Sequence, residues 1–284
     1  RSHAIAMASK GAKVVVNDFS GSNEISENAK SVVKEIISAG GEAIAHGANV
    51  ANFDQVQSMV GEAIDKWGRV DILVNNAGIL RDKTFLKMSV EDMREVIDVH
   101  LMGSLNCSKA VWEIMREQSY GRIVFTSSSS GLYGNFGQTN YGAAKMAMVG
   151  VMNTLHLEGM KYNIKVNCLA PTAGTAMTDG LFPEPVFKLM PPESVSPGVV
   201  FLCSEDAPSR KVLAAGGGSF AIFKGFETEG VNLLPDELSA ESVAKYWDKI
   251  DDEDNMQEPQ SGSAQSQKFA IQAAEKLGLD LSKY

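Results

Sequence analysis

Short runs of apolar residues alternate along most of the chain with longer segments in which apolar residues recur every three or four positions. The short runs predict buried strands, and the longer segments predict helices with one apolar face. Five strands are predicted, at residues 13–16, 42–45, 70–75, 122–126 and 165–169. Strands that are apolar throughout, separated by helices of about ten or more residues, are typical of a parallel sheet covered on both faces. The pattern therefore predicts a Rossmann-like, doubly wound α/β fold with its ligand site at the carboxyl ends of the strands.

Beyond residue 225 the alternation stops. Residues 239–250 and 268–277 have helical spacing, and the acidic, polar stretch 251–267 between them is typical of a mobile connector. We therefore expect one catalytic domain over residues 1–225 and a helical extension over residues 226–284. The helices of the extension are expected to pack on the domain or to cover a dimer, and not to carry chemistry.

The composition narrows the classes of protein to which the chain can belong. With 284 residues, of which 44% are hydrophobic, the chain can bury one large core. A net charge of −9 argues against a nucleic-acid partner, and the lack of a run of about 18 apolar residues argues against a membrane partner. The three cysteines lie far apart and lack metal-ligand spacing, which favours free thiols in a reducing compartment and neither a disulfide nor a zinc site.

One tyrosine stands in a pattern that suggests chemistry. Tyr141 lies four residues before Lys145 and thirteen after Ser128, and none of the other five tyrosines has a lysine four residues on. On a helix, residues four apart share a face, so the lysine charge is expected to lower the pKa of the phenol toward neutrality. Such a pair also occurs by chance as a solvated pair on a helix surface. Because Tyr141 follows a predicted strand and a serine-rich turn, an active site is the better interpretation.

A second motif, Asn75-Asn76-Ala77-Gly78, follows the predicted strand 70–75 and offers small residues where a ligand can approach the backbone closely. With this turn, Ser128, Tyr141 and Lys145 in this order and spacing, the chain resembles the short-chain dehydrogenase/reductase family over nearly its whole length. Within that family, NNAGILRD (75–82) and LYGNFGQTNY (132–141) are similar to the (3R)-hydroxyacyl-CoA dehydrogenase domain of type 2 peroxisomal multifunctional enzymes.

The narrower resemblance implies an NAD-dependent oxidoreductase of fatty-acid β-oxidation, which oxidises (3R)-3-hydroxyacyl-CoA to 3-oxoacyl-CoA. A 3-oxoacyl reductase and an alcohol or steroid dehydrogenase of the same family share the catalytic residues and remain alternatives. A catalytically silent binding protein is a further alternative if the family's Gly-rich turn is truly absent. The family also implies a homodimer or a tetramer built from dimers, formed through the helices at residues 91–118 and 142–162. A bacterial cytoplasm or a eukaryotic peroxisome is the expected location, and no targeting signal is visible.

The resemblance assigns roles to the three residues of the motif. Tyr141 is expected to be the general base in alcohol oxidation and the general acid in ketone reduction. Lys145 is expected to lower the pKa of Tyr141 and to bind the nicotinamide ribose. Ser128 is expected to hydrogen bond the reacting oxygen.

Two further features near this site have alternative interpretations. His100 stands where most of the family has an asparagine whose backbone supports a water-mediated proton relay, and the acyl-CoA subfamily also carries histidine there. A buried helical histidine can equally be structural. Arg81 and Lys83 follow the Asn-Asn-Ala-Gly turn and either meet the phosphates of CoA or are solvated charges.

The predicted cofactor is NAD. Asp18 follows the strand 13–16, where the dinucleotide-binding fold places a carboxylate that binds the adenosine ribose hydroxyls and repels a 2′-phosphate. An aspartate of a turn or a helix N-cap is the alternative. Asn49 and Val50 either flank the adenine or belong to a plain loop. The other expected cofactor-binding residues are Asn76, Ala77, Gly78, Tyr141, Lys145, Pro171 and Thr175.

In the family, a first strand and a Gly-rich, phosphate-binding turn precede a helix that resembles residues 2–10. We therefore expect the sequence to begin just after that turn. The stretch after Asp18 is also shorter than in the family. Because that first strand is central in the sheet, the two strands that would flank it are expected to have unpaired edges.

Overall fold

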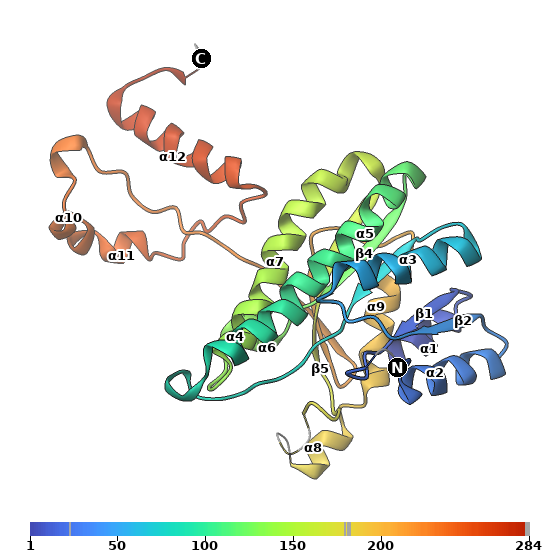
Figure 1. The fold of residues 1–284 in the computed structure, drawn as a ribbon. Coiled ribbons are helices and arrows are strands. Elements are labelled where there is room, and N and C mark those ends of the chain that lie inside the picture. The colour runs from blue at the N-terminus through green and yellow to red at the C-terminus, as the bar shows by residue number, and fades with distance from the viewer. Residues whose placement is uncertain (23, 179, 181–182, 282–284) are drawn as a thin grey trace. The chain divides into compact units, whose positions relative to one another are not determined.

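The computed structural model describes residues 1–22, 24–178, 180 and 183–281. The chain divides into two compact units, Arg1–Phe223 and Lys224–Tyr284 (Figure 1). The assignment of catalysis to residues 1–225 and of a helical extension to residues 226–284 stays a prediction. None of the helices in the described residues is both long enough and apolar enough to cross a membrane.

The first unit contains two sheets. Strands β1 (Val14–Asn17) and β2 (Ala43–His46) pair in parallel. The larger sheet has the order β3-β4-β5-β6-β7 and consists of Ile72–Asn75, Gly121–Thr126, Ile164–Thr172, Val212–Gly216 and Ser219–Phe223. All five predicted strands are present, which confirms the α/β fold.

Strands β6 and β7 were not predicted from the sequence, and β7 is antiparallel to β6. They are joined by Gly217 and Gly218, which have φ angles of 55° and 78°. Positive φ at both turn residues is what a tight two-residue hairpin requires, and glycine adopts it at little cost. The glycines also interrupt the apolar run by which a strand is identified, so the expectation of a wholly parallel sheet was wrong at this edge.

The two sheets do not hydrogen bond to each other. In the described part of the chain, β1 pairs only with β2, and β3 pairs only with β4. The facing edges of β1 and β3 are thus unpaired, as expected from the sequence. Apolar contacts nevertheless join the two sheets, since Val14 of β1 packs with Met7 and with Ile72 and Val74 of β3 in one cluster.

Helices cover both faces of the larger sheet, because the side chains of β4 alternate between two cores. Ile123 and Phe125 point into a core formed with α5 and α7, and Val124 points into a second core formed with α9. The helices of the first unit are α1 (Ser2–Ala8), α2 (Glu27–Ser38), α3 (Phe53–Trp67), α4 (Val90–Ile97), α5 (Gly103–Gln118), α6 (Ser129–Tyr133), α7 (Thr139–Gly159), α8 (Glu184–Lys188) and α9 (Ser196–Leu202). A π-helical turn, Asp98–Met102, joins α4 to α5.

The second unit has the short helices α10 (Ala240–Lys245) and α11 (Trp247–Ile250) and the longer helix α12 (Gly262–Leu277). Both predicted helical segments are present. Helix α12 begins six residues before the predicted start, because Ser261 caps it by accepting a hydrogen bond from the Ala264 backbone N–H at 3.2 Å. The predicted connector 251–267 is therefore helical over its last residues.

Candidate active site

Ser128, Tyr141 and Lys145 come together because two helices cross closely. Ser128 follows β4 and caps α6, accepting a hydrogen bond from the Ser130 N–H at 3.2 Å. Tyr141 and Lys145 lie on the first turns of α7. A Cβ atom on Gly131 of α6 would lie 2.8 Å from the Lys145 carbonyl carbon, which is too close, so only glycine fits at this crossing. The crossing therefore brings Ser128 close enough to Tyr141 to lower the pKa of its phenol.

The pKa of Tyr141 differs from the sequence-based expectation. Burial raises it above the ordinary value, the hydrogen bond from Ser128 opposes that effect, and the charge of Asp82 adds to it. The ammonium of Lys145 lies 5.5 Å from the centre of the Tyr141 ring. Removing a phenol from water penalises the phenolate, and burial is the largest influence on this pKa.

Lys145 is itself buried, with 4% of its surface exposed. Its Nζ donates a hydrogen bond to the Thr126 carbonyl oxygen at 2.7 Å, and its own carbonyl accepts one from Ser127 Oγ at 2.8 Å. Burial lowers the pKa of Lys145 to about 7. A lysine with this pKa is only partly charged at neutral pH, which explains why it does not produce the expected lowering at Tyr141.

His100 lies in the π-helical turn and is 2% exposed. Its Nε2 is 3.1 Å from the backbone nitrogen and 2.8 Å from the carbonyl oxygen of Ile79, and its Nδ1 has no partner in the described residues. Burial lowers the pKa of His100 to about 4, so the ring is neutral at pH 7. The ring meets Tyr141 edge to face, with 5.2 Å between ring centres. Gly78 is needed beside it, since a Cβ there would lie 2.2 Å from His100 Cε1.

Asp18 lies directly after β1, at the carboxyl end where a dinucleotide ribose is expected. One of its carboxylate oxygens accepts a hydrogen bond from Ser26 Oγ at 2.5 Å. Ser26 in turn caps α2 by accepting from the Ala29 N–H. The carboxylate is half-buried, and it can still accept hydrogen bonds from a ligand because an ionised carboxylate has about four acceptor sites.

Asn49 and Val50 follow β2 but are engaged within the protein. Val50 is 8% exposed and packs against α5, where a Cβ on Gly103 would lie 2.5 Å from its Cγ2. The Val50 carbonyl accepts a hydrogen bond from Asn106 Nδ2 at 2.9 Å, and the Asn49 N–H donates to Gln55 Oε1 at 2.8 Å. These contacts give both residues a structural role in the loop after β2. An adenine contact for them stays a prediction.

The other predicted cofactor residues lie at the ends of β3 and β5. Asn76 and Ala77 are exposed after β3, and Asn76 Oδ1 accepts a hydrogen bond from Thr126 Oγ1 at 3.4 Å. Pro171 is the second-last residue of β5. Thr175 lies in the following loop, and its N–H donates to Thr178 Oγ1 at 2.8 Å. A carboxylate, an amide, a lysine and small exposed residues thus line the carboxyl ends of β1, β3, β4 and β5, and this donor set fits a dinucleotide.

The two cations near the Asn-Asn-Ala-Gly turn are both paired. Arg81 forms a bidentate ion pair with Glu95, at 2.9 and 3.0 Å, and Lys83 Nζ lies 2.7 Å from Asp92 Oδ2. A CoA phosphate would have to compete with these carboxylates, so the contacts favour solvated surface ion pairs over a preformed phosphate site.

Sequence reasoning missed four residues that hold the site together. Thr126 and Ser127 bind Lys145, and Gln138 and Asp82 form hydrogen bonds beside Ser130. Thr126 acts through its backbone carbonyl, which no side-chain motif can reveal. The signal available for Ser127 and Gln138 was their place in the polar run around Ser128 and Tyr141.

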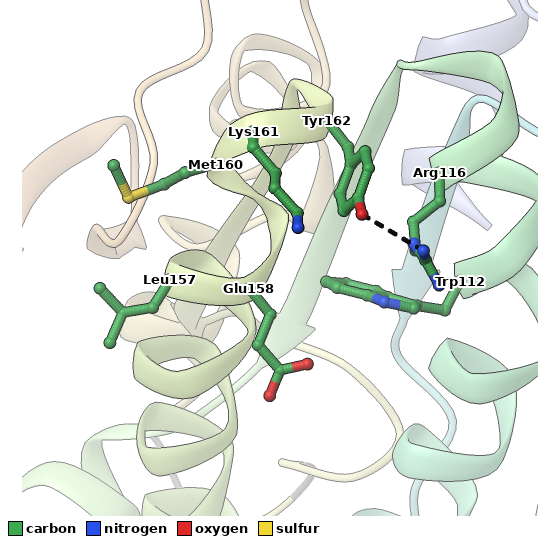
Figure 2. Close-up of a pocket in the computed structure, with 7 residues that line it drawn as sticks. All are labelled: Trp112, Arg116, Leu157, Glu158, Met160, Lys161 and Tyr162. Carbon is green, nitrogen blue, oxygen red and sulfur yellow. Dashed lines mark hydrogen bonds between the residues drawn. The ribbon is translucent and has the colours of Figure 1, made fainter.

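An open cavity of about 490 Å³ lies elsewhere, on the outer side of α5 and the end of α7 (Figure 2). In it, Arg116 donates a hydrogen bond to the Tyr162 hydroxyl at 3.2 Å. The cavity is lined by Trp112, Arg116, Leu157, Glu158, Met160, Lys161 and Tyr162. Leu157 lies about 24 Å along α7 from Tyr141, since each helical residue rises 1.5 Å, so this cavity is not the candidate active site.

Comparison with known proteins agrees with this geometry. The profile of the family described as short chain dehydrogenase matches residues 1–185. A short-chain type dehydrogenase/reductase of Mycobacterium tuberculosis is 46% identical over 257 residues, which are 89% of this chain and 90% of that protein. Peroxisomal multifunctional enzyme type 2 of Mus musculus is 42% identical over 271 residues, which are 92% of this chain but only 36% of that enzyme.

A solved structure of full-length peroxisomal multifunctional enzyme type 2 from Drosophila melanogaster has the same fold. It matches with a TM-score of 0.82 at 34% identity, and the match covers 98% of this chain and 47% of that one. This chain therefore spans about a third to a half of the multifunctional enzymes that it resembles.

Proposed function

The chain belongs to the short-chain dehydrogenase family, and from this premise we propose that it oxidises (3R)-3-hydroxyacyl-CoA to 3-oxoacyl-CoA with NAD. It is an oxidoreductase of that family. The observation that carries the proposal is that Ser128, Tyr141 and Lys145 meet where α6 crosses α7, with Lys145 buried and its ammonium 5.5 Å from the centre of the Tyr141 ring. This arrangement places a proton acceptor and a hydrogen-bond donor at one point.

In the proposed reaction, the substrate's C3 hydroxyl binds between Ser128 and Tyr141. The phenolate oxygen of Tyr141 takes the hydroxyl proton, and Ser128 donates a hydrogen bond to the C3 oxygen as it becomes a carbonyl. NAD, when bound, supplies the acceptor for the hydride that leaves C3. Lys145, anchored on the Thr126 carbonyl, binds the cofactor ribose and passes on the proton from Tyr141. His100, whose ring contacts Tyr141 and whose Nδ1 is unpartnered in the described residues, is placed in that proton path.

The substrate class is proposed from the segments that line this site. NNAGILRD carries Gly78, which makes room for His100, and Asp82, whose charge acts on Tyr141. LYGNFGQTNY leads from α6 into Tyr141. Both segments resemble the (3R)-hydroxyacyl-CoA dehydrogenase domain, and the names of the mouse and fly relatives place those proteins among peroxisomal multifunctional enzymes.

The decisive experiment compares substrates. Purified protein is assayed with NAD and a 3-hydroxyacyl-CoA, a 3-hydroxyacyl-carrier-protein thioester, a simple secondary alcohol and a hydroxysteroid. We expect the highest kcat/KM with the CoA thioester. A higher kcat/KM with the carrier-protein thioester, the alcohol or the steroid would select another member of the family. If NAD does not bind at all in a titration, the chain is a binding protein and not a dehydrogenase.

For the cofactor, we expect Asp18→Ala to relax a preference for NAD over NADP. The carboxylate binds the ribose hydroxyls and repels a 2′-phosphate, so its removal should reduce the ratio of the two kcat/KM values by about tenfold or more. Kinetics with both cofactors measure the ratio. Asp54→Asn, which removes an exposed carboxylate at the start of α3, is the matched control. Equal use of NAD and NADP by the unaltered protein would refute the role of Asp18.

We also propose that the chain pairs with a second copy through the outer faces of α5 and α7. These helices and the turns beside them expose several large apolar side chains, namely Met102, Met146, Leu157 and Met160. Water contact at these side chains is unfavourable, so sedimentation at micromolar concentration should give a dimer or a dimer-based tetramer. Leu157→Asp should weaken the association, and a monomeric unaltered protein would contradict it.

A further inference from the structure

A row of hydrogen bonds with no assigned role in the proposed reaction leads from the loop after β3 to Ser128. Gln138, which is 7% exposed, precedes α7 and joins two loops. Its Nε2 donates to Asp82 Oδ2 at 2.6 Å. Its Oε1 accepts from Ser130 Oγ at 2.7 Å and from Asn135 Nδ2 at 3.0 Å. The loop after β3 is thereby tied to the loop that enters the tyrosine helix.

The direction of these bonds is fixed by Asp82. An ionised carboxylate only accepts hydrogen bonds, so Gln138 must turn its NH₂ group toward Asp82 and its oxygen toward Ser130. The Ser130 hydroxyl must then donate its single proton to Gln138. No other orientation of this amide satisfies both neighbours.

The row continues to the catalytic serine. Ser130 is the second residue of α6, and its backbone N–H donates to Ser128 Oγ at 3.2 Å. With one lone pair of its oxygen occupied in this way, Ser128 still has its own proton to donate to Tyr141, whose pKa it lowers. A backbone hydrogen bond from the Lys83 N–H to the Gly137 carbonyl oxygen, at 3.0 Å, also ties these two loops together.

We propose that Asp82 and Gln138 are positioning residues of the catalytic site, which fix the direction of the hydrogen bonds that end on Ser128 and Tyr141. Gln138 orients the first turn of α6, and Asp82 both orients Gln138 and places a negative charge near the phenol. Neither residue touches the reacting atoms. The inference rests on the proposed function, because it assumes that Tyr141 exchanges the proton of the substrate.

The groups around Tyr141 determine how each substitution should shift the pKa of its phenol. Lys145 faces its ring from the same helix, the neutral His100 faces it from the π-helical turn, and Asp82 acts on it from the loop after β3. The charge of Asp82 raises the pKa of Tyr141, and the hydrogen bond from Ser128 lowers it. Asp82 therefore raises this pKa directly, whereas Gln138 should lower it indirectly, by way of α6 and Ser128.

The first variant is Asp82→Asn. It removes the charge, while the asparagine oxygen can still accept from Gln138, and Asp82 is exposed, so the fold should survive. We expect the pKa of Tyr141 to fall, which moves the rise of kcat/KM for oxidation to lower pH. Phenolate absorbance during an alkaline titration, corrected with Tyr141→Phe, gives the same pKa without an assay. Glu91→Gln, which removes an exposed carboxylate from the neighbouring helix α4, should shift neither measurement.

The second variant is Gln138→Met, which keeps the volume but removes all three hydrogen bonds of the side chain. The first turn of α6 then loses its tie to Gln138, so the Ser130 backbone N–H holds Ser128 Oγ less firmly. Ser128 then lowers the pKa of Tyr141 less, and that pKa should rise. We expect kcat to fall about fivefold to tenfold, the scale of one net hydrogen bond, with little change in KM for NAD. In a double variant, adding Asp82→Asn should cause no further fall in kcat, because the Gln138 side chain that Asp82 orients is already absent.

Opposite shifts in the two variants support the inference, since a general loosening of the fold would move both in the same direction. Shifts of the same sign, or an Asp82→Asn profile that coincides with the unaltered protein, would overturn it. If Tyr141→Phe keeps full activity, the proposed function fails, but the absorbance titration still decides whether Asp82 and Gln138 act on Tyr141.

Discussion

Replacing Tyr141 by Phe should lower the turnover number for oxidation by about two orders of magnitude or more, the usual contribution of a positioned acid or base. The substitution removes one oxygen atom from a half-buried ring that keeps its edge contact with His100. The fold is therefore expected to persist, and the loss should appear in kcat and not only in KM. Steady-state kinetics with NAD and the thioester measure it.

The same residue fixes the pH dependence. Oxidation needs the phenolate of Tyr141, and burial raises the pKa of that phenol above its ordinary value, so kcat/KM for oxidation should keep rising with pH into the alkaline range. Reduction needs the protonated phenol and should fall as the pH passes above that pKa. Tyr133→Phe is the matched control, since Tyr133 lies on α6 and is exposed. Near-normal turnover in Tyr141→Phe would place the chemistry at another residue.

The fold could be predicted where burial alone determines the pattern. All six residues of β4 are buried, and an apolar run reveals such a strand. The β6–β7 hairpin could not be identified in this way, because β7 is mostly exposed and its turn consists of glycines. Arg122 shows a different limit. It is buried within β4 because the carbonyl oxygens of Gly121, Asn163, Ser204 and Glu205 accept its hydrogen bonds, and these lie up to 83 residues away.

The candidate site could be predicted where its residues follow each other at fixed spacing. Ser128, Tyr141 and Lys145 meet because one strand end, one short helix and one long helix are consecutive. The bond between Asp82 and Gln138 joins residues 56 apart, and spacing gives no sign of it. The predicted direction of the pKa shift of Tyr141 was wrong for a related reason. The burial of the phenol and of Lys145 is a property of the folded chain and cannot be read from their spacing.

The second large effect expected concerns stereochemistry. Ser128 and Tyr141 lie beside each other where α6 packs against α7, so both can contact the C3 oxygen of one substrate. Lys145 and the loop after β5 would hold the cofactor, so the hydride would be taken from one side and the rest of the substrate would extend on the other. The C3 hydrogen of only one epimer can then face the hydride acceptor. We expect the (3R)-3-hydroxyacyl-CoA to react at least about a hundredfold faster than the (3S) epimer.

Assays of both pure epimers with NAD measure this ratio, and the (3S) epimer should act as a competitive inhibitor, because it makes the same contacts through CoA. The hydroxyl of a wrongly oriented epimer can still reach Tyr141, so binding alone does not distinguish the two. Turnover does, because a displacement of the reacting hydrogen forfeits the advantage of orientation even when the proton acceptor is in place. Faster reaction of the (3S) epimer would reverse the predicted geometry of Ser128 and Tyr141 toward the cofactor, and turnover of neither epimer would rule out an acyl-CoA substrate.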